Sequence, residues 1–156
     1  MIVAKLHFSR ITVKKYVYAV QTTRGIIQGS DNYGMRTVRS EKFRYIMNLN
    51  PEATFQNIVT NSIASGGKFY KSWIDKAATD SLAKQLVYKF AHRPAEELYD
   101  VENDPLEMNN IANDSRLASV KKDLKVRLLK WMEQQGDKGQ QTEMEALEHQ
   151  VKGGKE

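Results

Sequence analysis

At 156 residues the chain is long enough for one domain with a sizeable apolar core. It has no cysteine, which excludes disulfide bonds and thiolate chemistry, and no run of about 18 apolar residues that would predict a membrane span. The net charge of +5 is unevenly distributed, because residues 1–49 hold nine basic and two acidic side chains. Such an excess favours a polyanionic partner, either sulfated glycan or nucleic acid, although arginine and lysine also serve simply to solvate the outer face of a strand.

The first half of the chain predicts three strands. Residues 1–15 form an N-terminal segment whose apolar character is interrupted by basic side chains, so we expect no secretory signal peptide. Residues 16–20 predict a buried strand, and the following loop contains Gly25 and Gly29. The β-rich runs 35–39 and 43–48, joined by a short connection, predict an antiparallel hairpin.

The middle of the chain predicts helices. Residues 54–61 suit a short helix, and residues 72–92 a longer one with Ser72 as its N-cap. Apolar side chains recur there at spacings of four and five residues, which indicates a buried stripe: Trp73, Ala77, Leu82, Leu86 and Phe90.

A corner follows at residues 97–111. Residues 97–101 predict a fourth strand, and Asp104 before Pro105 predicts a turn, because the residue before proline avoids the α region. We expect Asp104 to cap a new helical turn, with Glu107 completing a capping box. The acidic side chains of the corner do not have the spacing of a calcium-binding loop, so turn and capping roles are preferred to cation binding.

The last predicted helix covers residues 115–135. Its apolar residues follow one face at spacings of three and four: Leu117, Val120, Leu124, Leu128 and Trp131. The polar residues 136–156 predict a frayed tail. Together the elements predict an α+β fold, in which an antiparallel sheet of about four strands packs against the two longer helices.

Several separated motifs resemble the C-terminal region of sulfatases. Residues 93–112 (RPAEELYDVENDPLEMNNIA) are similar to the ELYDL…DPxExxNLA signature, and residues 33–46 to the R-x-V-R…Y-K-Y-I strand pair. Residues 48–51, 54–56 and 20–23 look most like the heparan N-sulfatase branch (sulfamidase, N-sulfoglucosamine sulfohydrolase). The resemblance covers roughly residues 16–135 and implies a sulfatase C-terminal subdomain, which packs beside a catalytic domain.

The resemblance also implies what this chain lacks. Sulfatases convert a Cys or Ser in C/S-x-P-x-R to the nucleophile formylglycine and use a divalent cation, calcium. None of Pro51, Pro94 and Pro105 has Cys or Ser two residues before it, so the motif is absent. The resemblance therefore implies no catalytic residue, metal ligand or cofactor in this chain, no activity alone, and a separate catalytic domain as partner. Full-length relatives are typically periplasmic, extracellular or lysosomal.

One loop region is a candidate binding site. Its hydroxyls, guanidinium groups and flexible glycine suit a sulfate or carboxylate: Thr22, Thr23, Arg24, Gly25, Asn32, Tyr33 and Arg36. By the resemblance, this loop would form part of the rim of the substrate pocket and face a sulfated glycan. The alternative is an ordinary solvated loop. The histidines at positions 7, 92 and 149 are too scattered to predict a metal site or a catalytic triad.

The sequence thus predicts an accessory subdomain of a sulfatase-family hydrolase acting on sulfated glycans, which contributes stability and part of the pocket rim. One alternative is a stand-alone basic module that binds sulfated polysaccharide or nucleic acid. Nucleic acid is disfavoured, because interleaved exposed aromatic residues and recognised nucleic-acid motifs are missing. A second alternative is a structural partner that docks through an exposed sheet face. No membrane partner is expected.

Overall fold

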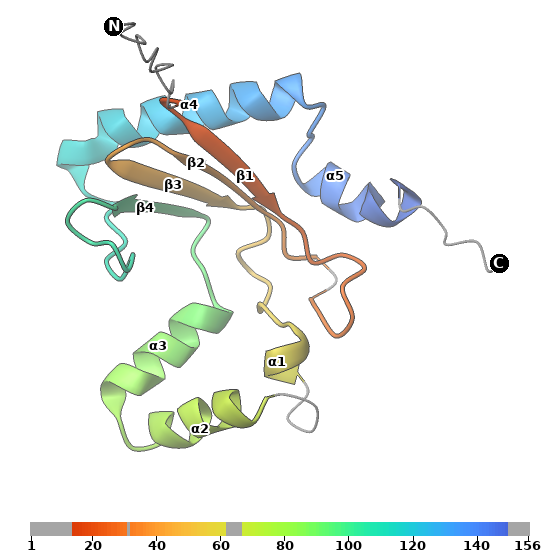
Figure 1. Cartoon of the computed structure of the whole chain (residues 1–156), viewed down its shortest axis with the longest axis vertical. Helices are drawn as coiled ribbons and strands as arrows, with labels where there is room; N and C mark the ends of the chain where they lie inside the picture. The colour runs from red at the N-terminus through yellow and green to blue at the C-terminus, as the bar shows by residue number, and fades with distance from the viewer. Residues whose placement is uncertain (1–13, 31, 62–66, 150–156) are drawn as a thin grey trace, which may run out of the picture.

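The computed structural model describes residues 14–30, 32–61 and 67–149. Its centre is an antiparallel sheet with strand order β1-β2-β3-β4 (Figure 1). The strands are β1 (Val17–Gln21), β2 (Met35–Arg39), β3 (Phe43–Asn48) and β4 (Glu96–Asp100). The predicted α+β class, the β2–β3 hairpin and the fourth strand are confirmed. Within the described residues, no helix is both long enough and apolar enough to cross a membrane.

The strand β1 lies at an edge of the sheet. It begins one residue later than predicted and pairs only with β2, with Val17 opposite Arg39. Val17 and Val20 are 58% and 55% exposed, so the prediction of a buried strand was wrong. Apolar composition indicated a strand correctly, but it could not distinguish an edge position from a central one.

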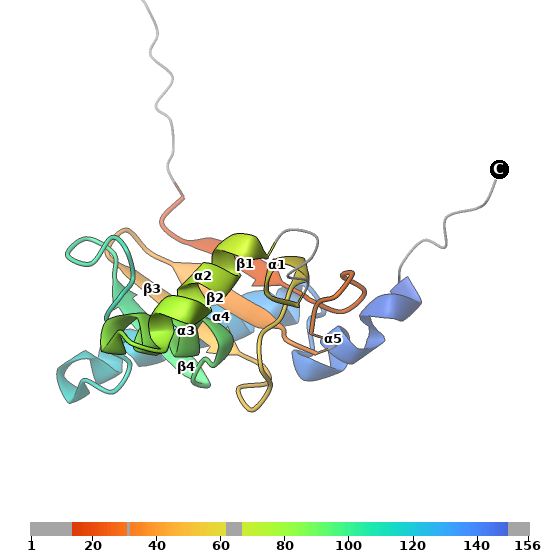
Figure 2. The same cartoon turned by 90° about the horizontal axis from the view of Figure 1, so that it is seen from below.

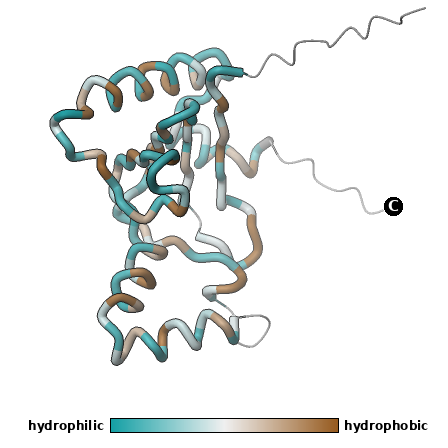
Figure 3. The backbone as a smooth tube through the Cα atoms, turned by 60° about the vertical axis from the view of Figure 1, so that its left-hand side comes forward, coloured by the Kyte–Doolittle hydropathy of each residue, from teal (hydrophilic) through white to brown (hydrophobic). Residues whose placement is uncertain are grey.

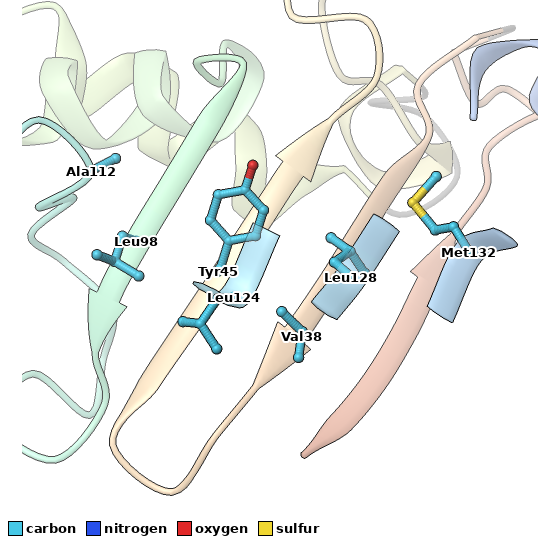
Figure 4. Packing of buried hydrophobic residues seen from close by; sticks show 7 residues of the cluster. All are labelled: Val38, Tyr45, Leu98, Ala112, Leu124, Leu128 and Met132. Atoms are coloured by element: carbon cyan, nitrogen blue, oxygen red, sulfur yellow. The ribbon is translucent and has the colours of Figure 1, made fainter. Parts of the chain in front are cut away.

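One face of the sheet is covered by the long helix α4 (Ala118–Gln134), which follows a 3-10 turn at Ser115–Leu117. The core on this face brings together Val38, Tyr45, Leu98, Ala112, Leu124, Leu128 and Met132 (Figure 4). Alternate residues of each strand point to this face, as period-two geometry requires. The apolar face predicted for residues 115–135 is confirmed.

Between β3 and β4 the chain forms the short helix α1 (Ile58–Asn61) and a helical hairpin, α2 (Lys68–Ala77) and α3 (Ser81–Ala91). The prediction of one helix over residues 72–92 was wrong, because the chain turns at residues 78–80. Asp80 adopts an extended backbone and its carboxylate accepts a hydrogen bond from the Ala83 amide at 2.9 Å, which starts α3. Ser72 lies inside α2 and caps nothing.

The corner after β4 contains no helix. Asp104 does accept backbone hydrogen bonds, from Met108 at 3.0 Å and Asn109 at 2.7 Å. Glu107, however, has a positive φ of 53° and directs its carboxylate to Arg44 at 3.0 Å, so the predicted capping box was wrong. Asp100 accepts hydrogen bonds from Asn103, which agrees with the predicted turn role.

The segment after α4 is structured as far as residue 149. It forms α5 (Gln140–Glu145) and a 3-10 helix at Ala146–His149, so the predicted frayed tail was wrong for these residues. Positive φ angles of 70° at Gly136 and 66° at Gly139 let the chain turn back toward the sheet. Residues 150–156 of the predicted tail, and 1–13 of the N-terminal segment, lie outside the described residues.

Candidate functional site

The guanidinium of Arg36 lies in a buried ionic cluster between the sheet and the C-terminal segment. Its side chain is 3% exposed, and its Nε contacts Asp137. Its Nη1 lies 2.9 Å from Glu143 Oε1 and donates to the Gln21 carbonyl at 3.3 Å. Burial lowers the pKa of Arg36, but the hydrogen bonds to Asp137 and Glu143 outweigh it and raise the pKa above its ordinary value. The cluster therefore fixes α5 against β2.

Three further predicted site residues join this cluster or lie next to it. The Thr22 hydroxyl donates to Glu143 Oε2 at 2.7 Å. The Thr23 hydroxyl is buried and accepts a hydrogen bond from the Tyr33 amide at 2.9 Å. The Tyr33 ring packs edge-on against Phe55, and burial raises the pKa of its hydroxyl. The loop is thus held by side chains that sequence reasoning assigned to a ligand.

Arg24 and Gly25 occupy the turn that follows. Gly25 has a φ of 82°, which favours glycine, and the Ile26 amide donates to the Thr23 carbonyl at 3.1 Å. Gly25 is exposed and Arg24 is half-buried. The structure therefore brings Thr22 and Arg36 together through Glu143, and Thr23 together with Tyr33, while the substrate-rim role of the whole set stays a prediction.

A second polar cluster, not found by sequence reasoning, lies on the sheet face opposite α4. Glu97 is 1% exposed, and its carboxylate accepts hydrogen bonds from Arg93 at 2.8 and 3.0 Å and from the Asn48 amide group at 2.7 Å. Tyr99 donates to the same carboxylate. Burial raises the pKa of Glu97, but these donors reverse the effect and lower it. No local sequence pattern indicated this cluster, because Asn48 and Glu97 come from two strands that only the pairing of β3 with β4 brings together.

Beside this cluster, Arg44 borders a hollow of about 240 Å³ on the same sheet face. Its guanidinium contacts Glu107 and donates to the Thr37 hydroxyl at 3.3 Å. Among the described residues, no group of three or more His, Cys, Asp or Glu side chains is placed to hold a metal ion.

Figures 2 and 3 show the course of the α2–α3 hairpin. Its side chains form an apolar groove of about 420 Å³. Its lining is Trp73, Lys76, Asp80, Leu82, Ala83, Leu86, Val87 and Phe90. Trp73 is 48% and Leu82 61% exposed, so the stripe predicted to be buried lies open instead. The hairpin is tied to the rest of the chain through aromatic rings in edge-to-face contact, Phe90 with Phe55 and Phe55 with Tyr33.

Comparison with known proteins places these features in context. No protein-family model matches the chain. The chain is similar to the ulvan-active sulfatase of Formosa agariphila, with 32% identity over 130 residues, which is 81% of this chain and 22% of that relative. The chain thus spans about a fifth of the relative's length. This match does not support the heparan N-sulfatase branch, but it supports the broader resemblance: over most of its length, the chain is related to a part of a sulfatase.

Proposed function

We propose that this chain is the C-terminal accessory region of a sulfatase that acts on a sulfated glycan, and that it supplies no catalytic group itself. The observation that carries the proposal is the match to 22% of a sulfatase, combined with the lack of any C/S-x-P-x-R motif. Its role would be to dock on a catalytic region, stabilise it and form part of the rim of the substrate pocket.

The hairpin groove is the surface we assign to that docking. Its apolar side chains Trp73, Leu82 and Leu86 are 48%, 61% and 39% exposed. Apolar patches of this kind mark contact surfaces with other proteins or domains. The relative is about five times longer than the matched segment, so a catalytic region of several hundred residues is the partner that this surface fits.

The substrate is proposed at two levels. The coarser proposal is a sulfated glycan, in keeping with a relative that is active on ulvan. The finer proposal is an N-sulfated glucosamine, favoured by the resemblance of residues 48–51 and 54–56 to heparan N-sulfatases. For the pocket rim, Gly25 is the better placed of these predicted residues, because it is exposed whereas Arg36 and Thr22 contact Glu143.

The docking proposal is tested by measuring, with isothermal titration calorimetry, binding between this chain and a separately produced sulfatase catalytic region. Trp73→Ser combined with Leu82→Ser should weaken binding at least about tenfold, since interface hot spots contribute 2 kcal/mol or more. The matched control is Val17→Ser combined with Val126→Ser, which removes exposed apolar side chains elsewhere and should change binding less than about twofold. Equal losses in the two variants, or no binding by the unmodified chain, would contradict the assignment.

A further inference from the structure

A basic groove lies at the β1–β2 end of the sheet, away from the hairpin and the Arg36 cluster. It has a volume of about 600 Å³ and is lined by Lys14, Lys15, Val17, Arg39, Ser40, Glu41 and Lys42. Four of the seven residues are cationic and one is anionic. Lys14 and Lys15 come directly before β1, whereas the other charged residues surround the turn between β2 and β3. The pairing of Val17 with Arg39 brings these two segments together.

Three of the four cations of this groove form no direct ion pair, unlike most arginines in the described part of the chain, although Lys15 also attracts Asp123 of α4. Arg36, Arg44 and Arg93 each contact a carboxylate, as do Arg116 and Arg127: these pairs neutralise their charges. Within the described residues, Lys14, Lys15 and Arg39 form no ion pair. Lys42 has one carboxylate partner, Glu102 at 3.5 Å, and both side chains are at least half exposed, so water screens this pair.

The groove continues along the open face of the sheet. Val17 and Arg39 line it. The next cross-strand pair on the same face, Ala19 and Thr37, lines the hollow beside Arg44. Residues two apart in a strand share one face, so the two hollows follow one another on the side opposite α4. An extended chain lying along β1 and β2 could contact both.

We infer that this groove is a subsite for a sulfated polysaccharide chain, separate from the place where sulfate is hydrolysed. Guanidinium and ammonium groups bind sulfate through charge-assisted hydrogen bonds, and several such contacts hold a polyanion. The groove lining contains no aromatic side chain on which bases could stack, which disfavours single-stranded nucleic acid. The inference rests on the proposed function, because a glycan sulfatase would hold its polymeric substrate beyond the reacting residue.

The test uses the whole chain with dextran sulfate, with unsulfated dextran as the uncharged probe and oligothymidylate as the nucleic-acid probe. Binding is measured by calorimetry at about 50 and 200 mM NaCl, where a polyanion site loses affinity steeply. The variant Lys14→Gln/Lys15→Gln/Arg39→Gln should bind dextran sulfate at least about tenfold more weakly and with a shallower salt dependence. The control Lys84→Gln/Lys130→Gln/Lys138→Gln removes the same charge from other exposed positions and should lose less than about threefold.

Equal losses in the two variants would overturn the inference, because net charge alone would then explain binding. Oligothymidylate that binds the groove as tightly as dextran sulfate would overturn it too, in favour of nucleic acid. Absence of dextran sulfate binding at the lower salt concentration would have the same effect. If the chain nevertheless binds the catalytic region, the accessory-region proposal survives and only the subsite is lost.

Discussion

At the scale of single residues, Arg36 balances two carboxylates in a site almost closed to water. Gly34 leaves the space that the Glu143 side chain occupies, because a Cβ at position 34 would lie 2.6 Å from Glu143 Cδ. Removing the guanidinium would leave Asp137 and Glu143 without a cation in a poorly hydrated place. Such a loss typically destabilises a protein by several kcal/mol.

We therefore predict that Arg36→Met lowers the free energy of unfolding by about 3–5 kcal/mol. Urea denaturation followed by circular dichroism measures this change. The control is Arg116→Met, whose side chain is 86% exposed, and which should leave the unfolding curve unchanged. An unchanged curve for Arg36→Met would contradict a structural role and return this residue to the candidate binding site.

Glu96 links the sheet to α4. Its carboxylate lies 2.7 Å from Lys125 Nζ, 2.7 Å from the Tyr45 hydroxyl and 3.3 Å from Lys121 Nζ. These donors, the Lys125 ammonium first, lower the pKa of Glu96 from 4.5 to about 2. Since the folded-state pKa lies below the unfolded one, ionised Glu96 stabilises the fold above the unfolded pKa. That contribution is lost as the pH falls from 4.5 toward about 2.

The corresponding prediction concerns the pH dependence of stability. The difference in unfolding free energy between the unmodified chain and Glu96→Gln should be largest near neutral pH and shrink as the pH falls from about 5 to 2. Denaturation curves at several pH values measure it. A difference that stays constant over this range would show that the charge of Glu96 does not contribute.

At the scale of elements, α4 and the α2–α3 hairpin carry similar apolar stripes but bury them differently. Leu128 in α4 is 0% exposed, whereas Leu82 in α3 is 61% exposed. We predict that Leu128→Ala costs about 2–5 kcal/mol of unfolding free energy, because it leaves a cavity in the core. Leu82→Ala should change stability by less than about 0.5 kcal/mol. Comparable losses would mean that the hairpin groove is closed in the isolated chain.

The same contrast explains which elements could be predicted. Helix geometry requires the apolar spacing of residues 115–135, and strand geometry requires the alternation in 35–39 and 43–48. These patterns predicted the helix and the two strands correctly. The break at Asp80 was missed, although an Asp before Ser is a good N-cap signal, because the apolar spacing continued across it. Burial of the stripe could not be read from its spacing, since periodicity shows a shared face and not what covers it.

The substrate-rim role of the candidate site stays a prediction, and the contacts that hold its side chains could not be read from the sequence for a different reason. Residue types in the loop at 22–36 indicated hydrogen-bond donors correctly, but donors serve a ligand or the fold equally well. The carboxylates that accept hydrogen bonds from the Arg36 guanidinium belong to Asp137 and Glu143, more than one hundred residues away in sequence. A polar segment such as 136–149 gave no local sign that it would supply these carboxylates.

At the scale of the whole molecule, three regions differ in chemistry: one is packed by the chain itself, and two are open to a partner. The sheet face under α4 (Figure 1) is filled by the chain's own core. The hairpin groove is apolar and open, and the β1–β2 end is basic. An accessory region that docks on a catalytic region through the hairpin groove and binds an anionic polymer at the basic end accounts for the two open surfaces.

The most direct test of the accessory role is a sulfatase assay with a chromogenic sulfate ester, an N-sulfated glucosamine and ulvan oligosaccharides. The chain is assayed alone and then mixed with a separately produced sulfatase catalytic region, after the latter is shown to be folded and to carry formylglycine. The account predicts no turnover by the chain alone and turnover by the mixture above that of the catalytic region by itself. Turnover by the chain alone, or no gain on mixing, would contradict it.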